Sequence, residues 1–140
     1  MTEQLLKPTV SVRSVLTDPR RNVLVLQRDT DGEWELPGGR LSPYESVCEG
    51  LHREVNEETT LSLEIEDILL ANSWLNDRNN DRLAVYYACH TDQRSVSLSE
   101  EHTSFRWVTH REATSLLSVP QATAVRRSCE DNTEKPILEI

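Results

Sequence analysis

Long apolar runs and paired cysteines are both missing from this sequence of 140 residues. No stretch approaches the roughly 20 apolar residues that a membrane-spanning helix needs, so we expect no membrane partner. The three cysteines, Cys48, Cys89 and Cys129, lie far apart and include no C-x-x-C pair. Their odd number and spacing favour reduced thiols over a disulfide framework or a zinc site.

Basic residues are also scarce, with 15 Lys and Arg against 24 Asp and Glu and a net charge of −9. This balance opposes stable binding to nucleic acid, which requires a positive field. A polyphosphate ligand would be repelled too, unless metal cations screened its charge. The N-terminus lacks the layout of a signal peptide, and residues 1–140 suffice for one core. We therefore expect a single cytoplasmic domain over residues 1–140.

The Pro-Gly-Gly sequence at residues 37–39 indicates a tight loop, because proline cannot donate to a strand and glycine admits positive φ. A helix start follows, with Ser42 as the N-cap, a proline at the first helical position and Glu45 completing a capping box. We therefore expect a helix over residues 43–59. Apolar residues on its inward face recur every fourth position, at Val47, Leu51 and Val55.

Three acidic residues are close together near the end of this predicted helix. Glu54, Glu57 and Glu58 stand at i, i+3 and i+4, so they project from one side. Each like-charge pair costs about 0.2–0.5 kcal/mol, and the negative end of the helix dipole adds to the cost. The cluster is typical of a site for a hard divalent cation, although a solvated acidic helix face shows the same pattern. Arg53 lies within reach to orient one of these carboxylates.

The spacing of these residues resembles the signature of the Nudix hydrolases, G-x5-E-x7-R-E-U-x-E-E-x-G-U, in which U is bulky and apolar. The matching segment begins at Gly39 and ends at Leu61, and eight of the nine specified positions agree. The exception is Thr60, which replaces the second glycine. A β-branched residue in the left-handed conformation costs on the order of 1–3 kcal/mol. We therefore expect the helix to end with a different turn.

The resemblance implies an α/β fold, the Nudix-type α/β/α sandwich, in which helices flank a mixed sheet. It implies Mg²⁺ or Mn²⁺ as the cofactor. The ion would be held by three glutamates and one backbone carbonyl, from Glu54, Glu57, Glu58 and Gly39.

The resemblance also implies catalytic residues outside the metal shell. Arg53 would fix the orientation of a carboxylate. The base that activates water would be Glu57, Glu54 or Glu101, which lies in a polar loop before the last predicted strand; Glu100 is the second choice in that loop. Arg28 and Arg40 would bind substrate phosphate, although Arg28 has an alternative as a surface partner of Asp29 or Asp31.

The implied reaction is hydrolysis of a phosphoanhydride bond in a nucleoside diphosphate linked to another group. Motifs typical of ADP-ribose, diadenosine polyphosphate and coenzyme A hydrolases are missing, which favours a ribo- or deoxyribonucleoside triphosphate pyrophosphatase. The alternatives are an ADP-ribose, nucleotide-sugar or dinucleotide pyrophosphatase, and a non-catalytic domain that binds a nucleotide and regulates a partner. The partner is a small-molecule nucleotide, and a homodimer is compatible with the sequence. Aromatic candidates for stacking a base are Trp74, Tyr86, Tyr87 and Phe105.

Hydrophobic periodicity supplies the remaining elements. Strands are predicted over residues 9–16, 23–26, 33–36, 63–74, 82–90 and 104–108, and helices over residues 110–117 and 120–127. The first two strands form a hairpin, and residues 76–81 form a polar hairpin loop. The tail over residues 130–140 frays or adds an edge strand.

Overall fold

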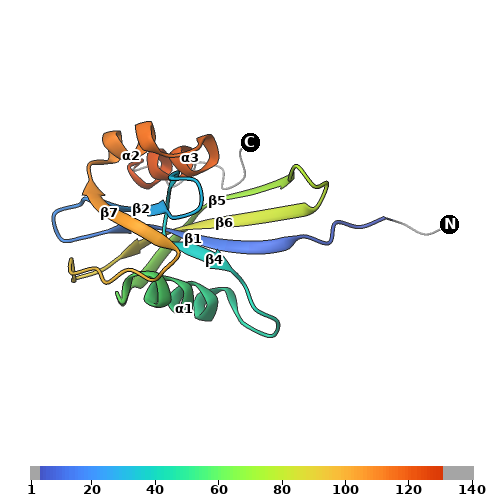
Figure 1. The fold of residues 1–140 in the computed structure, drawn as a ribbon, viewed down its shortest axis with the longest axis horizontal. Coiled ribbons are helices and arrows are strands. Elements are labelled where there is room, and N and C mark those ends of the chain that lie inside the picture. Colours follow the sequence, from blue (N-terminus) through green and yellow to red (C-terminus); the bar gives the residue numbers. More distant parts are fainter. Residues whose placement is uncertain (1–3, 131–140) are drawn as a thin grey trace.

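A mixed sheet with helices on both faces makes up the computed structural model, which describes residues 4–130 (Figure 1). The strands are β1 (Thr9–Thr17), β2 (Val23–Arg28), β3 (Trp34–Glu35), β4 (Gly38–Arg40), β5 (Glu64–Leu75), β6 (Asp81–His90) and β7 (His102–Val108). The helices are α1 (Val47–Thr59), α2 (His110–Leu116) and α3 (Val119–Ser128). Helix α1 lies on one face of the sheet, and α2 and α3 lie on the other. The predicted α/β/α sandwich is confirmed.

Strand β1 is the centre of the sheet. It pairs in parallel with β6 along its whole length, from Thr9 opposite Arg82 to Thr17 opposite His90. It also pairs antiparallel with β4 and, at Thr17, with the start of β2, which confirms the predicted hairpin. A parallel neighbour requires a long crossover connection, and this one contains α1. Segments that are distant in the sequence thereby meet beside the end of α1.

Successive side chains of β2 enter two separate cores. Val23 and Val25 pack in the core beneath α2 and α3, whereas Leu24 and Leu26 pack in the core above α1. All four are fully buried. A strand with both faces covered reads as a continuous apolar run, which explains why this segment shows no alternation in the sequence.

The start of α1 differs from the prediction. The N-cap is Ser46, whose hydroxyl accepts from the Glu49 N–H while the Glu49 carboxylate accepts from the Ser46 N–H. At the predicted cap, the Ser42 N–H does donate to Glu45 Oε1 at 2.9 Å, but Tyr44 has φ 67° and the chain makes a separate turn there before the helix begins. Both serines stand three residues before a glutamate, so the spacing alone does not distinguish them.

The end of α1 also differs from the prediction. Thr60 adopts the left-handed conformation, with φ 65° and ψ 7°, and its N–H donates to the Asn56 carbonyl. The threonine therefore occupies the conformation that the usual glycine would take, and the turn is retained at a cost in backbone strain.

Replacing Thr60 by glycine should stabilise the protein by about 1 kcal/mol, because relief of strain exceeds the entropy lost by the freer glycine backbone. Differential scanning calorimetry should record a rise of about 3 °C in the unfolding midpoint. As a control, glycine at Thr123 within α3 should lower the midpoint. A midpoint that falls for Thr60→Gly as it does for the control would remove the strain argument.

A short strand occurs where the Pro-Gly-Gly sequence predicted only a loop. β4 pairs antiparallel with β1, with Gly38 opposite Arg13 and Gly39 opposite Val12. Gly38 has φ +152°, and a Cβ there would lie 2.1 Å from the Val12 carbonyl oxygen. Glycine is thus required for the close approach that lets this segment join the sheet.

The remaining elements agree with the prediction to within a few residues, including α2, α3 and the turn at residues 76–80. The predicted behaviour of residues 131–140 lies outside the described part of the chain. Among residues 4–130, no helix has the length and apolarity needed to cross a membrane.

Candidate functional site

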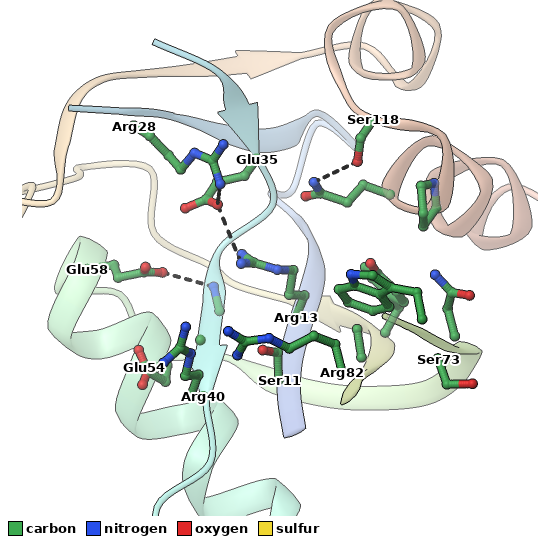
Figure 2. Close-up of a pocket in the computed structure, with 18 of the residues that line it drawn as sticks. Ser11, Arg13, Arg28, Glu35, Arg40, Glu54, Glu58, Ser73, Arg82 and Ser118 are labelled. Atoms are coloured by element: carbon green, nitrogen blue, oxygen red, sulfur yellow. Dashed lines mark hydrogen bonds and ion pairs between the residues drawn. The ribbon is translucent and has the colours of Figure 1, made fainter. Parts of the chain in front are cut away.

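A cleft of about 890 Å³ opens beside the C-terminal half of α1, where β1, β4 and β6 meet (Figure 2). Glu54 and Glu58 face it from the helix, whereas Ser73 and Ser118 lie at its opposite side. Four acids and four arginines line its walls: Glu35, Glu54, Glu58, Glu101, Arg13, Arg28, Arg40 and Arg82. In a chain of net charge −9, this concentration of arginines marks a place that suits an anion as well as a cation.

Glu58 is the most buried acid of the predicted trio, with 3% of its surface exposed. Its Oε1 accepts from the Gly38 N–H at 2.8 Å, which ties the end of α1 to β4. Burial raises the pKa of Glu58 to about 8, although the Gly38 N–H and the cation of Arg13 act in the opposite direction. Burial also raises the pKa of Glu54, which the guanidinium of Arg53 only partly offsets. At both carboxylates, burial therefore outweighs the positive groups nearby.

Arg53 connects three carboxylates of the signature. Its Nε donates to Glu45 at 2.6 Å, and Nη1 lies 3.1 Å from Glu54 and 3.3 Å from Glu57. Nη2 donates to the Arg40 carbonyl at 3.1 Å, which anchors the same guanidinium to β4. These hydrogen bonds lower the pKa of Glu45 to about 2. Glu45 thus holds Arg53 and also accepts from the Ser42 N–H at 2.9 Å, although α1 itself begins only after Ser46.

Glu57 lies apart from the other two acids of the trio. Its side chain is 59% exposed, its carboxylate lies against Arg53, and it does not line the cleft. The structure therefore brings Glu54 and Glu58 together at the cleft and leaves Glu57 at its outer edge.

The loop acid Glu101 reaches the cleft from another part of the chain. It lines the same cavity as Glu54 and interacts electrostatically with it. The Glu101 carbonyl accepts from the Asp29 N–H at 2.9 Å, which fixes the backbone at the start of β7. Glu100 does not line this cleft.

The arginines of the cleft fall into two kinds. Arg28 lines the cleft, but it is paired with Asp31 and lies 3.6 Å from Glu35. It therefore has the carboxylate partner that the sequence offered as an alternative role. Within residues 4–130, the guanidinium groups of Arg40 and Arg82 make no ion pair or hydrogen bond. These two cations remain available to an anionic ligand.

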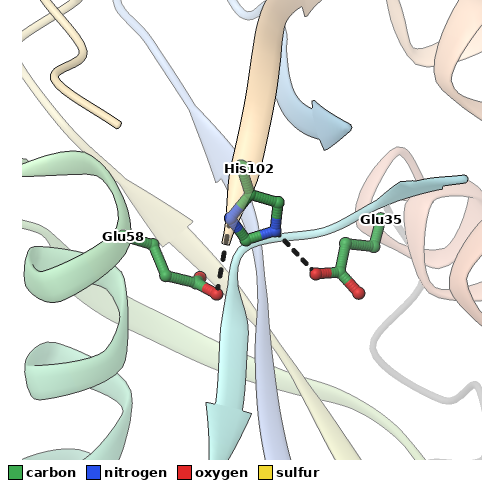
Figure 3. Close-up of side chains that lie close together, drawn as sticks. All are labelled: Glu35, Glu58 and His102. Atoms are coloured by element: carbon green, nitrogen blue, oxygen red, sulfur yellow. Dashed lines mark hydrogen bonds and ion pairs between the residues drawn. The ribbon is translucent and has the colours of Figure 1, made fainter. Parts of the chain in front are cut away.

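A buried hydrogen-bonded group, which the sequence reasoning missed, adjoins the trio (Figure 3). His102 Nε2 lies 2.7 Å from Glu35 Oε2, and its Nδ1 lies 4.0 Å from Glu58 Oε2. Burial raises the pKa of Glu35, but the bond from His102 and the cation of Arg13 outweigh it and lower that pKa. One donor atom of each of the three residues lies within 4.8 Å of the others, so this group could itself hold a metal ion.

Four charged or titratable residues were thus not predicted: Arg13, Glu35 and Arg82, which line the cleft, and His102, which adjoins it through Glu35. Each was assigned to a strand or its edge, where a polar residue is ordinarily solvated. A signal was present for two of them, because Glu35 stands just before the Pro-Gly-Gly sequence and His102 just after Glu101.

The aromatic candidates divide between cleft and core. Trp74, 43% exposed, and the buried Tyr86 line the cleft. Tyr87 packs against the core above α1, and Phe105 does not line the cleft. Trp74 and Tyr86 are accompanied by Asn72 and Gln121, which offer hydrogen-bonding amides at the same wall.

The donors in the cleft fit a hard divalent cation. Glu54 and Glu58 offer carboxylate oxygens whose raised pKa shows that burial outweighs nearby cations, and β4 lies beside them with its backbone carbonyls. A Cβ at Gly39 would lie 2.3 Å from Glu54 Oε2, so only a bare backbone leaves room for this carboxylate. Such an all-oxygen set suits Mg²⁺ or Mn²⁺.

An α/β/α sandwich with a helix-borne acidic cluster in its cleft defines the class of Nudix pyrophosphohydrolases. The model of the NUDIX domain family matches residues 7–130, and the chain therefore belongs to this family.

Individual relatives agree with this assignment. The chain is 30% identical to a MutT-like protein of Streptomyces ambofaciens over 72% of its own length and 64% of that protein. It is 30% identical to the nucleoside triphosphatase NudI of Enterobacter sp. (strain 638) over 66% of its length and 72% of the relative. The MutT protein of Methanosarcina mazei Go1 superimposes with a TM-score of 0.78 at 27% identity, covering 93% of this chain and 100% of that one. The chain thus spans less than two thirds of the Streptomyces relative.

Proposed function

We propose that the protein is a Mg²⁺- or Mn²⁺-dependent pyrophosphohydrolase that cleaves a phosphoanhydride bond of a nucleoside triphosphate. The observation that carries this proposal is the meeting of Glu54, Glu58 and Glu101 with unpaired arginines in one cleft. Carboxylates bind the cations that a polyphosphate requires, and arginines bind its oxygens directly. The Enterobacter relative, which is named a nucleoside triphosphatase, favours a triphosphate over the alternatives.

In this proposal, Glu54 and Glu58 with the carbonyl of Gly39 hold the metal ions. Glu57 joins them as a ligand on the strength of its place in the signature alone. In this structure its carboxylate lies against Arg53. Bound divalent ions would neutralise phosphate charge and lower the pKa of the attacking water. Arg53 keeps Glu54 in position from one side, and β4 does so from the other.

Glu101 is the proposed base, because it lines the same cleft as Glu54, interacts with it electrostatically and comes from a separate loop. Glu57 and Glu54 remain the other candidates for this role. Arg40 and Arg82 would bind the phosphate chain, and Arg28 would contribute while remaining paired with Asp31. The wall that carries Trp74 and Tyr86 would receive the nucleoside, with the indole available for stacking.

A substrate panel tests the proposal. Purified protein should be incubated with Mg²⁺ and with ribo- and deoxyribonucleoside triphosphates, nucleoside diphosphates, ADP-ribose, a nucleotide sugar and a dinucleoside polyphosphate. We expect the triphosphates to react with the highest kcat/KM and to give a nucleoside monophosphate and pyrophosphate by mass spectrometry. EDTA should stop the reaction, and Glu54→Gln is the inactive control. Faster cleavage of ADP-ribose or a dinucleotide would replace the triphosphate assignment, and tight binding without turnover would favour a regulatory domain.

A further inference from the structure

The Glu35–His102 pair links a wall of the cleft to the start of β7 and has no role in the function proposed above. Both side chains are almost completely buried, at 9% and 1% exposure, and they meet at 2.7 Å (Figure 3). A buried polar pair costs free energy unless its members satisfy each other, and an apolar pair would pack there without that requirement. The presence of the pair therefore calls for a reason beyond packing.

Glu35 is held rigidly from its own side. Its Oε1 lies 3.4 Å from Arg13 Nη2 and 3.6 Å from Arg28 Nη1, while Oε2 accepts from His102. The next residue, Leu36, donates its N–H to the side chain of Gln121 at 2.7 Å. The carboxylate is thus a fixed point on β3, connected to β1, β2 and α3.

His102 connects Glu35 to the loop that carries Glu101. It follows Glu101 directly and begins β7, opposite Arg28 in the pairing of β7 with β2. Upstream, the same loop is attached to the end of α1, where Ser99 N–H donates to the Glu58 carbonyl at 3.2 Å. The imidazole therefore fixes the downstream end of the segment that carries Glu101.

Only one side of the imidazole makes this connection. An ionised carboxylate only accepts hydrogen bonds, so Nε2 is the donor in the bond to Glu35. Within residues 4–130, Nδ1 has no hydrogen-bond partner, and its nearest polar neighbour is Glu58 Oε2 at 4.0 Å. The side-chain link between His102 and Glu35, which adds to the backbone contacts of Glu101 and His102, thus depends on the donor at Nε2.

We propose that the Glu35–His102 hydrogen bond is a positioning contact that holds Glu101 opposite Glu54 and Glu58 across the cleft. His102 is then a positioning residue, and it acts through Glu101 without touching the substrate. The assignment rests on the proposed function, in which Glu101 is the base. A displacement of a catalytic group by about 1 Å is sufficient to reduce turnover about 100-fold.

Two substitutions of His102 distinguish the role of Nε2 from that of Nδ1. Glutamine places an amide N–H close to the position of Nε2 and keeps the donor to Glu35, whereas asparagine ends near Nδ1 and loses that donor. His90→Asn is the matched control, because His90 contacts Asp92 at the surface through Nε2 at 3.2 Å and does not line the cleft.

His102→Asn should lower kcat about 100-fold with KM and the Mn²⁺ dissociation constant unchanged, because the metal ligands and arginines remain in place. His102→Gln should keep kcat within about threefold of the original, as should the His90 control. Equal losses in the two His102 variants, or normal turnover in His102→Asn, would overturn the proposal.

Amide hydrogen exchange at Asp29 supplies a readout that does not depend on activity, because this N–H donates to the Glu101 carbonyl. Exchange at Asp29 should accelerate in His102→Asn and not in His102→Gln. If the unmodified protein hydrolyses no nucleotide, the proposed function fails, and exchange at Asp29 still decides the positioning role. Unchanged exchange in His102→Asn would refute the contact itself.

Discussion

Replacing Glu58 by glutamine should stabilise the metal-free protein at pH 8 and at the same time lower kcat by about 1,000-fold or more. The loss of turnover follows because a ligand carboxylate supplies several kcal/mol of charge stabilisation to the bound cation and the reacting phosphate. The gain in stability follows because the ionised carboxylate is buried, and the Gly38 N–H and the cation of Arg13 do not offset the cost of that burial. Opposite effects on stability and activity are the mark of a group that is retained for binding.

The raised pKa of Glu58 determines how the stability of the metal-free protein changes with pH. The pKa of Glu58 is about 8 in the folded protein against an ordinary value of 4.5, so the folded state binds the proton more tightly than the unfolded state. The stability that the Glu58 proton contributes is therefore fully present below about pH 4.5 and is lost as the pH rises through 8. Each pKa unit corresponds to about 1.4 kcal/mol, which places the total loss on the order of a few kcal/mol.

Differential scanning calorimetry in EDTA at pH 5 and pH 8 measures the effect. The unfolding midpoint of the original protein should fall between these values by more than that of Glu58→Gln. Glu66→Gln, an exposed acid on β5 that does not line the cleft, is the control and should follow the original protein. A Glu58→Gln protein that is less stable than the original at pH 8 would show that neighbouring groups offset the cost of burying the ionised carboxylate.

Substituting lysine for Arg53 should lower kcat about 100-fold although the positive charge is kept. The guanidinium contacts Glu45, Glu54 and the Arg40 carbonyl through different nitrogens, and a single ammonium cannot reproduce that geometry. Loss of the contact to Glu54 leaves a metal ligand free to turn, so affinity for Mn²⁺ should weaken about 10- to 100-fold.

Steady-state kinetics and Mn²⁺ titration measure the two effects. Arg106→Lys is the matched control, because Arg106 makes a single surface ion pair with Glu112 at 3.5 Å. Its turnover and metal affinity should be unchanged. Normal Mn²⁺ affinity in Arg53→Lys would mean that Arg53 neutralises charge without orienting Glu54.

The position of the acids on α1 was predictable because it depends on local spacing alone. Residues at i, i+3 and i+4 share one side of any helix, so Glu54 and Glu58 meet at the cleft wherever the helix begins. Their differing environments were not predictable. Glu58 is buried because β4 lies against the end of α1, whereas Glu57 lies at the outer edge, 59% exposed and in contact with Arg53.

The partners that come from other strands could not be derived from spacing. Arg13, Arg82 and Gly38 meet only because β1 pairs with β6 on one edge and β4 on the other. Strand pairing of this kind depends on register between segments far apart in the sequence. The capping error has a local cause, since Tyr44 adopts a left-handed conformation that separates the turn at Ser42 from the helix capped by Ser46.

The central claim is that Glu54 and Glu58 hold divalent cations, and isothermal titration of the protein with Mg²⁺ or Mn²⁺ tests it most directly. At pH 7, in two buffers of different ionisation enthalpy, binding should release close to one proton, because Glu58 with its pKa of about 8 must lose its proton to become a ligand. Both binding and proton release should disappear in the Glu54→Gln, Glu58→Gln double variant. Metal binding of unaltered affinity in that variant would contradict the account.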